Sequence, residues 1–318
     1  MSWWCSFFTY LGFLVFLNFL YDTFISPLQL LYHKWLKVLS KEISLVEKYG
    51  KWAAITGSTD GIGKALARQL ARRGFNIVLI ARNEEKLKRV AEEIENDFGV
   101  EVYKIQADFS HGKPIYEKLF EDLAKKPIKF LVNNVGIANS TPASVETFSS
   151  EHLWDMINVN IAAATQLSRH FVDLWHRKGI KGCIVNISSA LELKPCPTGA
   201  VYGASKAYLR SFTLALQHEA KPLGIRVQLV TPAFVVTRMC NYSAFLMKGN
   251  LFTPQVDQYA EWAVESIGRT PYTTGYFWHG ILITFIKITP WRLSNKLAVI
   301  IASYLTNGIN WRQKLATL

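Results

Sequence analysis

The sequence predicts an α/β protein with a doubly wound parallel sheet, built as a single domain behind an N-terminal hydrophobic anchor helix. Three observations lead to this fold class. Short apolar runs alternate with helical patterns through the middle of the chain, the first run ends in a glycine-rich turn, and no charged side chain occurs between Met1 and Tyr21. A length of 318 residues suits one large or two small domains, and no internal repeat or long linker divides this chain.

The N-terminal segment is long and apolar enough to cross a bilayer as one helix, which takes roughly 20 residues. A cleaved secretory signal would need a basic start and a small-residue cleavage site, and neither is present; an interfacial or core helix is the other alternative. We expect a membrane anchor over residues 1–32 and a basic linker over residues 33–49. Positive flanks stay in the cytosol, which predicts a cytosolic main domain. The basic side chains behind the anchor are His33, Lys34, Lys37, Lys41 and Lys48.

Residues 50–275 form the predicted main domain. Strands that are covered on both faces have nearly continuous apolar runs, and helices between such strands indicate a parallel, doubly wound sheet. The expected strands are Lys51–Thr56, Asn76–Ile80, Glu101–Ala107, Lys129–Asn133, Cys183–Ser188 and Arg226–Val230. The expected helices are Lys64–Arg73, Glu84–Phe98, Tyr116–Lys125, Glu151–Arg177 and Ala204–Lys221.

The first strand runs into a glycine-rich turn that suits a dinucleotide. Three glycines in a GxxxGxG spacing let the backbone approach a pyrophosphate, and the following helix offers unpaired N–H groups and the positive end of its dipole. The turn consists of Gly57, Ser58, Thr59, Asp60, Gly61, Ile62 and Gly63, and Lys64 follows it.

The second strand ends in an arginine where many NAD sites have an acid. A carboxylate at this place holds the ribose 2′-hydroxyl, whereas a guanidinium matches a 2′-phosphate. Arg82 stands there, after Ala81, and Lys64 adds positive charge. The alternative is a solvated arginine at a helix entry. Together with the glycine turn, Arg82 favours NADP(H) over NAD(H).

A serine, a tyrosine and a lysine follow with spacing that suits carbonyl chemistry. Tyr202 and Lys206 are four residues apart and share one helix face. We expect the ammonium to lower the pKa of the phenol, so that Tyr202 acts as general acid in reduction or base in oxidation. Ser189, just past a strand end, can donate a hydrogen bond to the substrate oxygen.

With these motifs in order, residues 50–275 resemble the short-chain dehydrogenase/reductase family, whose fold is of the Rossmann type. The resemblance assigns catalysis to Asn160, Ser189, Tyr202 and Lys206, with Asn160 ordering a relay water, and also places Tyr202 and Lys206 at the cofactor. It adds an adenine contact, an asparagine in an NNAG-like element and a PGxxxT-like loop. Those cofactor positions are Asp108, Asn134, Pro232, Val235 and Thr237, with Val135 and Ala233 departing from the family pattern.

Finer features resemble one branch: the membrane-anchored 17β-hydroxysteroid dehydrogenase and very-long-chain 3-oxoacyl-CoA reductase group, with its hydroxysteroid dehydrogenase-like relatives. These features are the apolar N-terminus, the run from Lys48 to Ala53 and the TGSTDGIGKA turn. The resemblance implies NADPH-dependent reduction of a steroid 17-ketone or a 3-oxoacyl-CoA, or the reverse reaction. It also allows a catalytically silent protein that binds the cofactor as a scaffold.

The same resemblance implies the endoplasmic reticulum membrane and a homodimer through the helices Glu151–Arg177 and Ala204–Lys221. The chain ends without a dilysine signal, so the mitochondrion stays an alternative. Beyond Thr237 the chain is heavily apolar, which suits a hydrophobic substrate or ordinary packing. The apolar residues there are Met239, Tyr242, Phe245, Leu246, Met247, Leu251 and Phe252.

Residues 276–318 form a C-terminal apolar extension. Its two runs, Tyr276–Ile288 and Leu297–Leu305, are each too short to span a bilayer alone. They suit either a strand and a helix that pack on the core, or a membrane-dipping lid with an aromatic edge. We keep both alternatives.

Composition limits the partners. The net charge of +12 allows nucleic acid, anionic lipid or a phosphorylated ligand, but no run of like charges or nucleic-acid motif occurs, so we expect no nucleic acid. The four cysteines include no CxxC pair, which predicts thiols in a reducing compartment. No histidine has the spacing of a metal ligand, so we expect no metal.

Overall fold

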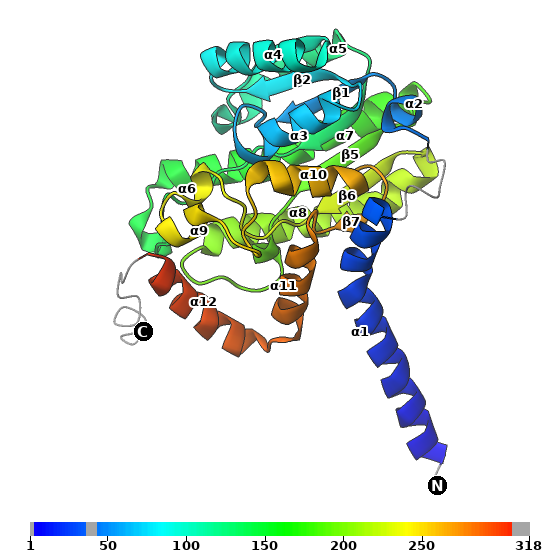
Figure 1. The fold of residues 1–318 in the computed structure, drawn as a ribbon, viewed down its shortest axis with the longest axis vertical. Helices are drawn as coiled ribbons and strands as arrows, with labels where there is room; N and C mark the ends of the chain where they lie inside the picture. Colours follow the sequence, from blue (N-terminus) through cyan, green and yellow to red (C-terminus); the bar gives the residue numbers. More distant parts are fainter. Residues whose placement is uncertain (1–2, 36–42, 307–318) are drawn as a thin grey trace.

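The computed structural model describes residues 3–35 and 43–306. Its centre is a seven-stranded parallel sheet with the order β3-β2-β1-β4-β5-β6-β7, seen in Figure 1. The strands are β1 (Trp52–Thr56), β2 (Asn76–Ala81), β3 (Val102–Gln106), β4 (Ile128–Asn133), β5 (Cys183–Ile187), β6 (Arg226–Val230) and β7 (Tyr272–Thr273). All six strands predicted from the sequence are present, and the two-residue β7 was not predicted.

Helices cover both faces of the sheet, as the continuous apolar strands require. Successive residues of a strand point to opposite faces, so Ala53 and Ile55 join one core while Ala54 joins the other. The first core packs under α3 (Gly61–Ala71), α4 (Glu84–Phe98) and α10 (Val256–Ser266), together with the short α2 (Leu45–Tyr49). The second packs under α5 (Tyr116–Ala124), α7 (Ala163–Arg177) and α8 (Ala200–Ala220).

The helix expected over Glu151–Arg177 is interrupted. It divides into α6 (Ser150–Ile157), a π-helical turn, η5 (Asn158–Ala162), and α7. Such wide turns are rare and often mark functional sites, and this one contains Asn160. Helix α8 begins at Ala200, four residues before the expected start, so that Tyr202 lies inside it.

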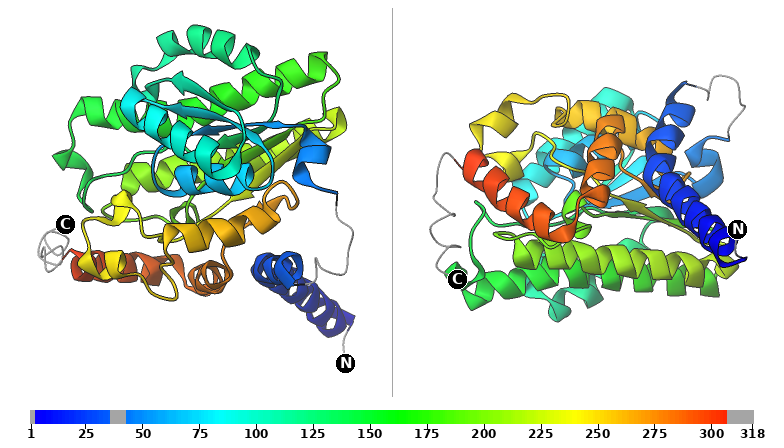
Figure 2. Two further views of the ribbon diagram at one scale, coloured as in Figure 1. Left: turned by 45° about the horizontal axis from the view of Figure 1, so that its top comes forward. Right: turned by 90° about the horizontal axis from the view of Figure 1, so that it is seen from below.

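Three helices lie outside the sandwich, on one end of the molecule. Helix α1 (Trp3–Trp35) continues past the expected boundary at residue 32, while the rest of the linker up to residue 42 lies outside the described residues. Helices α11 (Phe277–Ile288) and α12 (Trp291–Leu305) form the C-terminal extension. Figures 1 and 2 show α1 projecting from the end at which α11 and α12 lie. The alternative that made the first C-terminal run a strand is wrong, because both runs are helical; the last residues of the extension, 307–318, lie outside the description.

The second half of α1 packs on the domain. The Thr274 N–H donates to Ser26 Oγ at 3.0 Å, and a Cβ placed on Gly280 of α11 would lie 3.1 Å from Pro27. The first half of α1 does not pack on the domain, because none of the residues in its most apolar stretch is buried in the protein. Within the described residues, α1 is the one helix of a length and composition that could cross a membrane.

Candidate active site

The glycine turn connects β1 to α3 at the point where the strand order reverses, which is where open α/β sheets bind ligands. Gly57 and Gly61 have φ of +63° and +51°, a region that suits glycine. Gly63 allows close packing, since a Cβ there would lie 2.3 Å from both the Gly57 carbonyl oxygen and Asn134 Nδ2. Asn134 fixes the turn from β4, because its amide donates to the Thr56 carbonyl at 2.9 Å.

A cavity of about 900 Å³ begins at this turn and extends to the C-terminal helices. Most of the predicted cofactor and catalytic residues line it. Ser58, Gly63 and Asn160 are not among the lining residues, and the first two serve packing around the turn. The predicted residues that do line the cavity are Gly57, Thr59, Asp60, Gly61, Ile62, Arg82, Asp108, Asn134, Ser189, Tyr202, Lys206, Pro232, Val235 and Thr237.

Ser189, Tyr202 and Lys206 meet in the middle of the cavity. Ser189 caps the 3₁₀ turn η6 (Ala190–Glu192) after β5, where its hydroxyl accepts from the Leu191 N–H at 3.3 Å, and it lines the same cavity as Tyr202. The Lys206 ammonium lies 5.7 Å from the centroid of the Tyr202 ring and donates to the Ile187 carbonyl at 3.2 Å. The three groups therefore stand where a carbonyl oxygen could be polarised and protonated.

The pKa values of this group differ from expectation. Desolvation raises the pKa of Tyr202 to about 12, and the nearby Ser189 hydroxyl only partly opposes this. Desolvation lowers the pKa of Lys206 to about 8, against the attraction of Glu192. The expected lowering of the Tyr202 pKa by Lys206 is therefore not found, because burial dominates. The phenol is protonated at neutral pH, which suits an acid.

Asn160 lies behind the cavity wall rather than on it. Its Oδ1 accepts from the Ile137 N–H at 2.8 Å, and its Nδ2 donates to the Ile137 carbonyl at 2.9 Å and to Ser205 Oγ at 3.1 Å. The side chain is 1% exposed. The π-helical turn thus presents an asparagine that holds the loop segment after β4 next to Lys206, since a Cβ on Gly136 would contact both Asn160 and Lys206.

The end of the cavity around Arg82 is basic, but Lys64 does not contribute to it as the sequence predicted. Lys64 is ion-paired with Glu93 of α4 and does not line the cavity. Lys86, in the first turn of α4, does line it. Sequence reasoning missed Lys86, although its position one helical turn after Arg82 could have indicated it. Arg82 and Lys86 are the cations on this side of the cavity.

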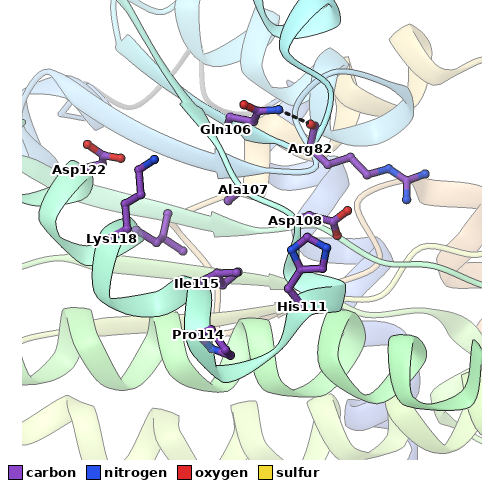
Figure 3. A pocket seen from close by; sticks show the side chains of 10 residues that line it. Arg82, Gln106, Ala107, Asp108, His111, Pro114, Ile115, Lys118 and Asp122 are labelled. Atoms are coloured by element: carbon purple, nitrogen blue, oxygen red, sulfur yellow. Dashed lines mark hydrogen bonds between the residues drawn. The ribbon is translucent and has the colours of Figure 1, made fainter. Parts of the chain in front are cut away.

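Asp108 joins this cavity to a smaller one of about 290 Å³. Burial acts to raise the pKa of Asp108, but hydrogen bonds from the N–H and the hydroxyl of Ser110 hold that pKa below its usual range. Figure 3 shows Arg82, Asp108 and His111 together on one side of the smaller cavity, with Gln106 donating to the Arg82 carbonyl at 3.1 Å. The carboxylate is thus stabilised in its ionised form at the edge of both cavities.

The loop after β6 is held by a histidine of the C-terminal extension. His279 of α11 accepts from the Ala233 N–H at 3.2 Å, and its other ring nitrogen lies 3.1 Å from the Phe234 carbonyl. Burial lowers the pKa of His279 to about 4, so the ring is neutral. The C-terminal extension therefore positions the Pro232–Thr237 loop.

The far end of the cavity is apolar. Two helices supply most of it, and the loop after Thr237 adds Met239, Cys240 and Tyr242. Tyr202 reaches this end, since its hydroxyl lies 3.9 Å from Met239 Sδ. The apolar lining residues of α11 and α12 are Leu282, Phe285, Ile286, Leu297, Ala298, Ile301, Ala302 and Leu305, and Ser294 of α12 lines the cavity as well. An apolar molecule bound next to Tyr202 would therefore contact mainly apolar side chains.

Comparison with known proteins agrees with this geometry. Residues 51–244 match the model of the short chain dehydrogenase family. The chain belongs to this family. The family resemblance drawn from the sequence is thereby confirmed.

Some relatives of this chain are named as inactive proteins and others as active enzymes. The chain is 46% identical to the human inactive hydroxysteroid dehydrogenase-like protein 1, over 79% of this chain and 76% of the relative. It is 39% identical to the zebrafish (Danio rerio) very-long-chain 3-oxoacyl-CoA reductase-A, over 77% and 76%. A Sphingobium yanoikuyae short-chain dehydrogenase solved in complex with NADPH aligns with a TM-score of 0.63 and 29% identity, over 70% of this chain and 87% of that one.

The residues present fit a nicotinamide dinucleotide. The positive-φ glycines, the close Gly63–Gly57 packing and the N-terminus of α3 form a cradle that a Cβ would fill. The carboxylate, the cations and the Tyr202–Lys206 pair follow along one cavity. Among the residues that the structure describes, no group of three or more His, Cys, Asp or Glu side chains could hold a metal ion.

Proposed function

We propose that this protein reduces a ketone on a hydrophobic substrate with NADPH, or catalyses the reverse oxidation. The observation that carries the proposal is the complete Ser189–Tyr202–Lys206 group between a dinucleotide cradle and an apolar chamber. A steroid 17-ketone and a 3-oxoacyl-CoA are the two substrate classes, in line with the names of its relatives.

The residues divide the chemistry among them. NADPH, when bound, supplies the hydride. Tyr202, whose raised pKa keeps it protonated at neutral pH, donates the proton to the carbonyl oxygen. Ser189 donates a hydrogen bond to that oxygen as charge develops on it. Lys206 binds the ribose hydroxyls, and Asn160 holds the segment that borders Lys206.

We also propose NADPH over NADH. Strand β2 ends at Ala81, so no carboxylate stands at its end to take a ribose 2′-hydroxyl, and Arg82 and Lys86 flank the cavity there. Gly57, Thr59, Asp60, Gly61 and Ile62 would line the pyrophosphate path, with Asp108 and Asn134 beyond it. Pro232, Val235 and Thr237 would hold the nicotinamide end.

The direct test is NADPH consumption by the full-length protein in detergent or membranes with a panel of steroid and acyl ketones. We expect turnover with at least one bulky ketone, and a loss on the order of a hundredfold or more in Tyr202→Phe. Equal turnover in the mutant would remove Tyr202 from the mechanism.

A silent, cofactor-binding scaffold is the second candidate. It is favoured by the name of the human relative and by Val135 and Ala233, which depart from the family pattern beside the cofactor cradle. Tight NADPH binding without reduction of any ketone in the panel would establish this alternative. Reduction of any one of them excludes it.

We further propose that α1 anchors the protein in the endoplasmic reticulum membrane with the dehydrogenase domain in the cytosol; the mitochondrial membrane is the alternative. The C-terminal helices lie at the same end as α1 (Figure 2), and no acidic residue follows Glu265. Trp291, Leu293 and Ile300 are exposed on α12 beside Arg292 and Lys296. An apolar and basic surface of this kind suits an anionic bilayer, so α11 and α12 act as a lid that rests on the membrane.

A truncation of residues 1–20 tests the anchor, because it removes the exposed part of α1 and leaves the Ser26 and Pro27 contacts intact. We expect release into high-salt supernatant. If the truncated protein stays on membranes, α11 and α12 carry the attachment.

We also propose that the protein forms a homodimer through α7 and α8, because aromatic side chains are exposed on and near these helices. Trp154 is 61% exposed and Tyr208 is 39% exposed near these helices. Light scattering of the solubilised wild type and of Tyr208→Glu tests it, since a dimer through this face should dissociate in the mutant.

A further inference from the structure

A buried carboxylate lies directly behind the catalytic group, and the mechanism above does not use it. Glu192 ends the 3₁₀ turn that Ser189 begins, and its N–H donates to the Ser189 carbonyl at 2.9 Å. The side chain of Glu192 is 0% exposed. A buried carboxylate is costly unless it is paired or hydrogen-bonded, so its neighbours indicate what it does.

The contacts of Glu192 join three elements of the site. Its Oε1 accepts from Thr231 Oγ1, at the end of β6, at 3.0 Å, and lies 3.5 Å from Arg210 Nε of α8. Its Oε2 is buried and has no hydrogen-bond partner among the residues that the structure describes. The carboxylate is therefore held on one side only, and its charge is incompletely neutralised by Arg210, whose side chain is 43% exposed.

The remaining groups around Glu192 are few. Lys206 and Arg210 face it from α8, Ser188 from the end of β5, and the buried hydroxyl of Tyr272 from β7. Lys206 is 4% exposed, and the attraction of Glu192 is what opposes the loss of its proton on burial. Burial raises the pKa of Glu192 itself to about 7, against the nearby Ser188 hydroxyl, the hydrogen bond from Thr231 and the charges of Arg210 and Lys206.

We propose that Glu192 is a positioning residue of the active site, which ties the Ser189 turn to β6 and α8 and supplies the buried counter-charge that keeps Lys206 protonated. The catalytic meaning of this role rests on the proposed function. Lys206 lies one helical turn before Arg210, which Glu192 contacts. The sign follows from the charges: an ionised Glu192 raises the pKa of Lys206, and a protonated Glu192 does not. Above about pH 7 the lysine depends on this carboxylate, whereas at pH 6 it does not.

Competitive acylation with trace acetic anhydride tests the electrostatic role directly, because only the unprotonated amine reacts. The full-length wild type, Glu192→Gln and Glu219→Gln are labelled between pH 6 and 10, and the Lys206 peptide is quantified by mass spectrometry. Glu192→Gln keeps an oxygen for Thr231 and loses the charge. Glu219 is exposed on the same helix and serves as the matched control.

We expect the labelling midpoint of Lys206 to fall by about one pH unit in Glu192→Gln, which is roughly a tenfold larger ratio of unprotonated to protonated lysine near pH 7. The midpoint should not move in Glu219→Gln. Equal midpoints in all three proteins would overturn the proposal. This readout needs neither cofactor nor substrate, so a failure of NADPH to bind any of the proteins counts against the proposed function and not against the role of Glu192.

The pH dependence of NADPH affinity, measured by fluorescence, then tests the functional consequence. At pH 6 the wild-type carboxyl is mostly protonated and therefore neutral, as glutamine is, so Glu192→Gln should bind NADPH like the wild type. At pH 8.5 the variant should bind NADPH several-fold more weakly. A loss that is equal at both pH values would assign Glu192 a merely structural role.

Discussion

The cavity has two halves that differ in chemistry and in origin. The cofactor half is made by turns that follow β1 to β5 and contains glycines, Asp108, Arg82 and Lys206. The substrate half is made by the loop after Thr237 and by α11 and α12, and its lining is apolar. Under the proposed function, residues positioned by the sheet carry out the reaction, and α11 and α12 select the substrate. Changes in the two halves should therefore separate catalysis from recognition.

The largest expected effect belongs to Ser189, where the halves meet. Ser189→Ala removes the donor aimed at the developing oxyanion, which typically costs about a hundredfold or more in kcat. The Leu191 N–H also loses its acceptor, at 3.3 Å. NADPH affinity should stay unchanged, because Ser189 does not contribute to the cradle. Stopped-flow turnover and NADPH fluorescence measure the two quantities, and an equal loss in both would contradict the division.

His279 joins the two halves and should make stability depend on pH. Its folded pKa of about 4 lies below the ordinary value, so the stability it contributes is present above pH 6.5 and is lost as pH falls from 6.5 towards 4. The expected loss is on the order of 2–3 kcal/mol.

Denaturant melts at several pH values check this expectation. His279→Gln should have lost this dependence, while His218→Gln, at an exposed position of α8, should keep it. If the melts of His279→Gln follow the wild type at every pH, burial of this ring is not what limits acid stability.

In the substrate half, a charge should weaken substrate binding alone. Ile300 and Ile301 are both partly exposed neighbours on α12, but of the two Ile301 lines the cavity and Ile300 does not. We expect Ile301→Glu to raise KM for a bulky ketone about tenfold or more, since an apolar contact is replaced by a group that must stay solvated. Ile300→Glu should have little effect on KM. A reversal of this order would mean that α12 presents its other face to the substrate.

In the cofactor half, Arg82→Ala should raise KM for NADPH by several-fold to tenfold and leave KM for NADH nearly unchanged. Arg89→Ala is the matched control, because Arg89 is an exposed arginine of α4 outside the cavity. Steady-state kinetics with both nucleotides distinguish the variants. Similar changes with NADH and NADPH would show that Arg82 does not read the 2′-phosphate.

The predictability of the two halves differs in the same way. The sheet, the glycine turn and the Tyr202–Lys206 spacing were predictable, because periodicity and local motifs depend on residues close in sequence. The π-helical turn at Asn160 was not, since its hydrogen bonds go to Ile137, 23 residues away. The pairing of Lys64 with Glu93 likewise depends on how α3 and α4 pack.

The substrate half depended on contacts that no local pattern contains. His279 meets Ala233 across 46 residues, and Ser26 meets Thr274 across 248. The apolar run Tyr276–Ile288 could be a strand or a helix by periodicity alone, as short apolar runs often can. Only its packing on Pro27 and on the loop at Ala233 determines that it is a helix beside the cavity.

Transfer of deuterium from NADPH labelled at the nicotinamide C4 position to a ketone tests the central claim most directly. The full-length protein is incubated with labelled NADPH and a mixture of steroid and 3-oxoacyl ketones, and the products are analysed by mass spectrometry. The account predicts one deuterium on the carbinol carbon of at least one bulky alcohol, with none formed by Tyr202→Phe. Bound NADPH with no deuterium in any product would contradict it.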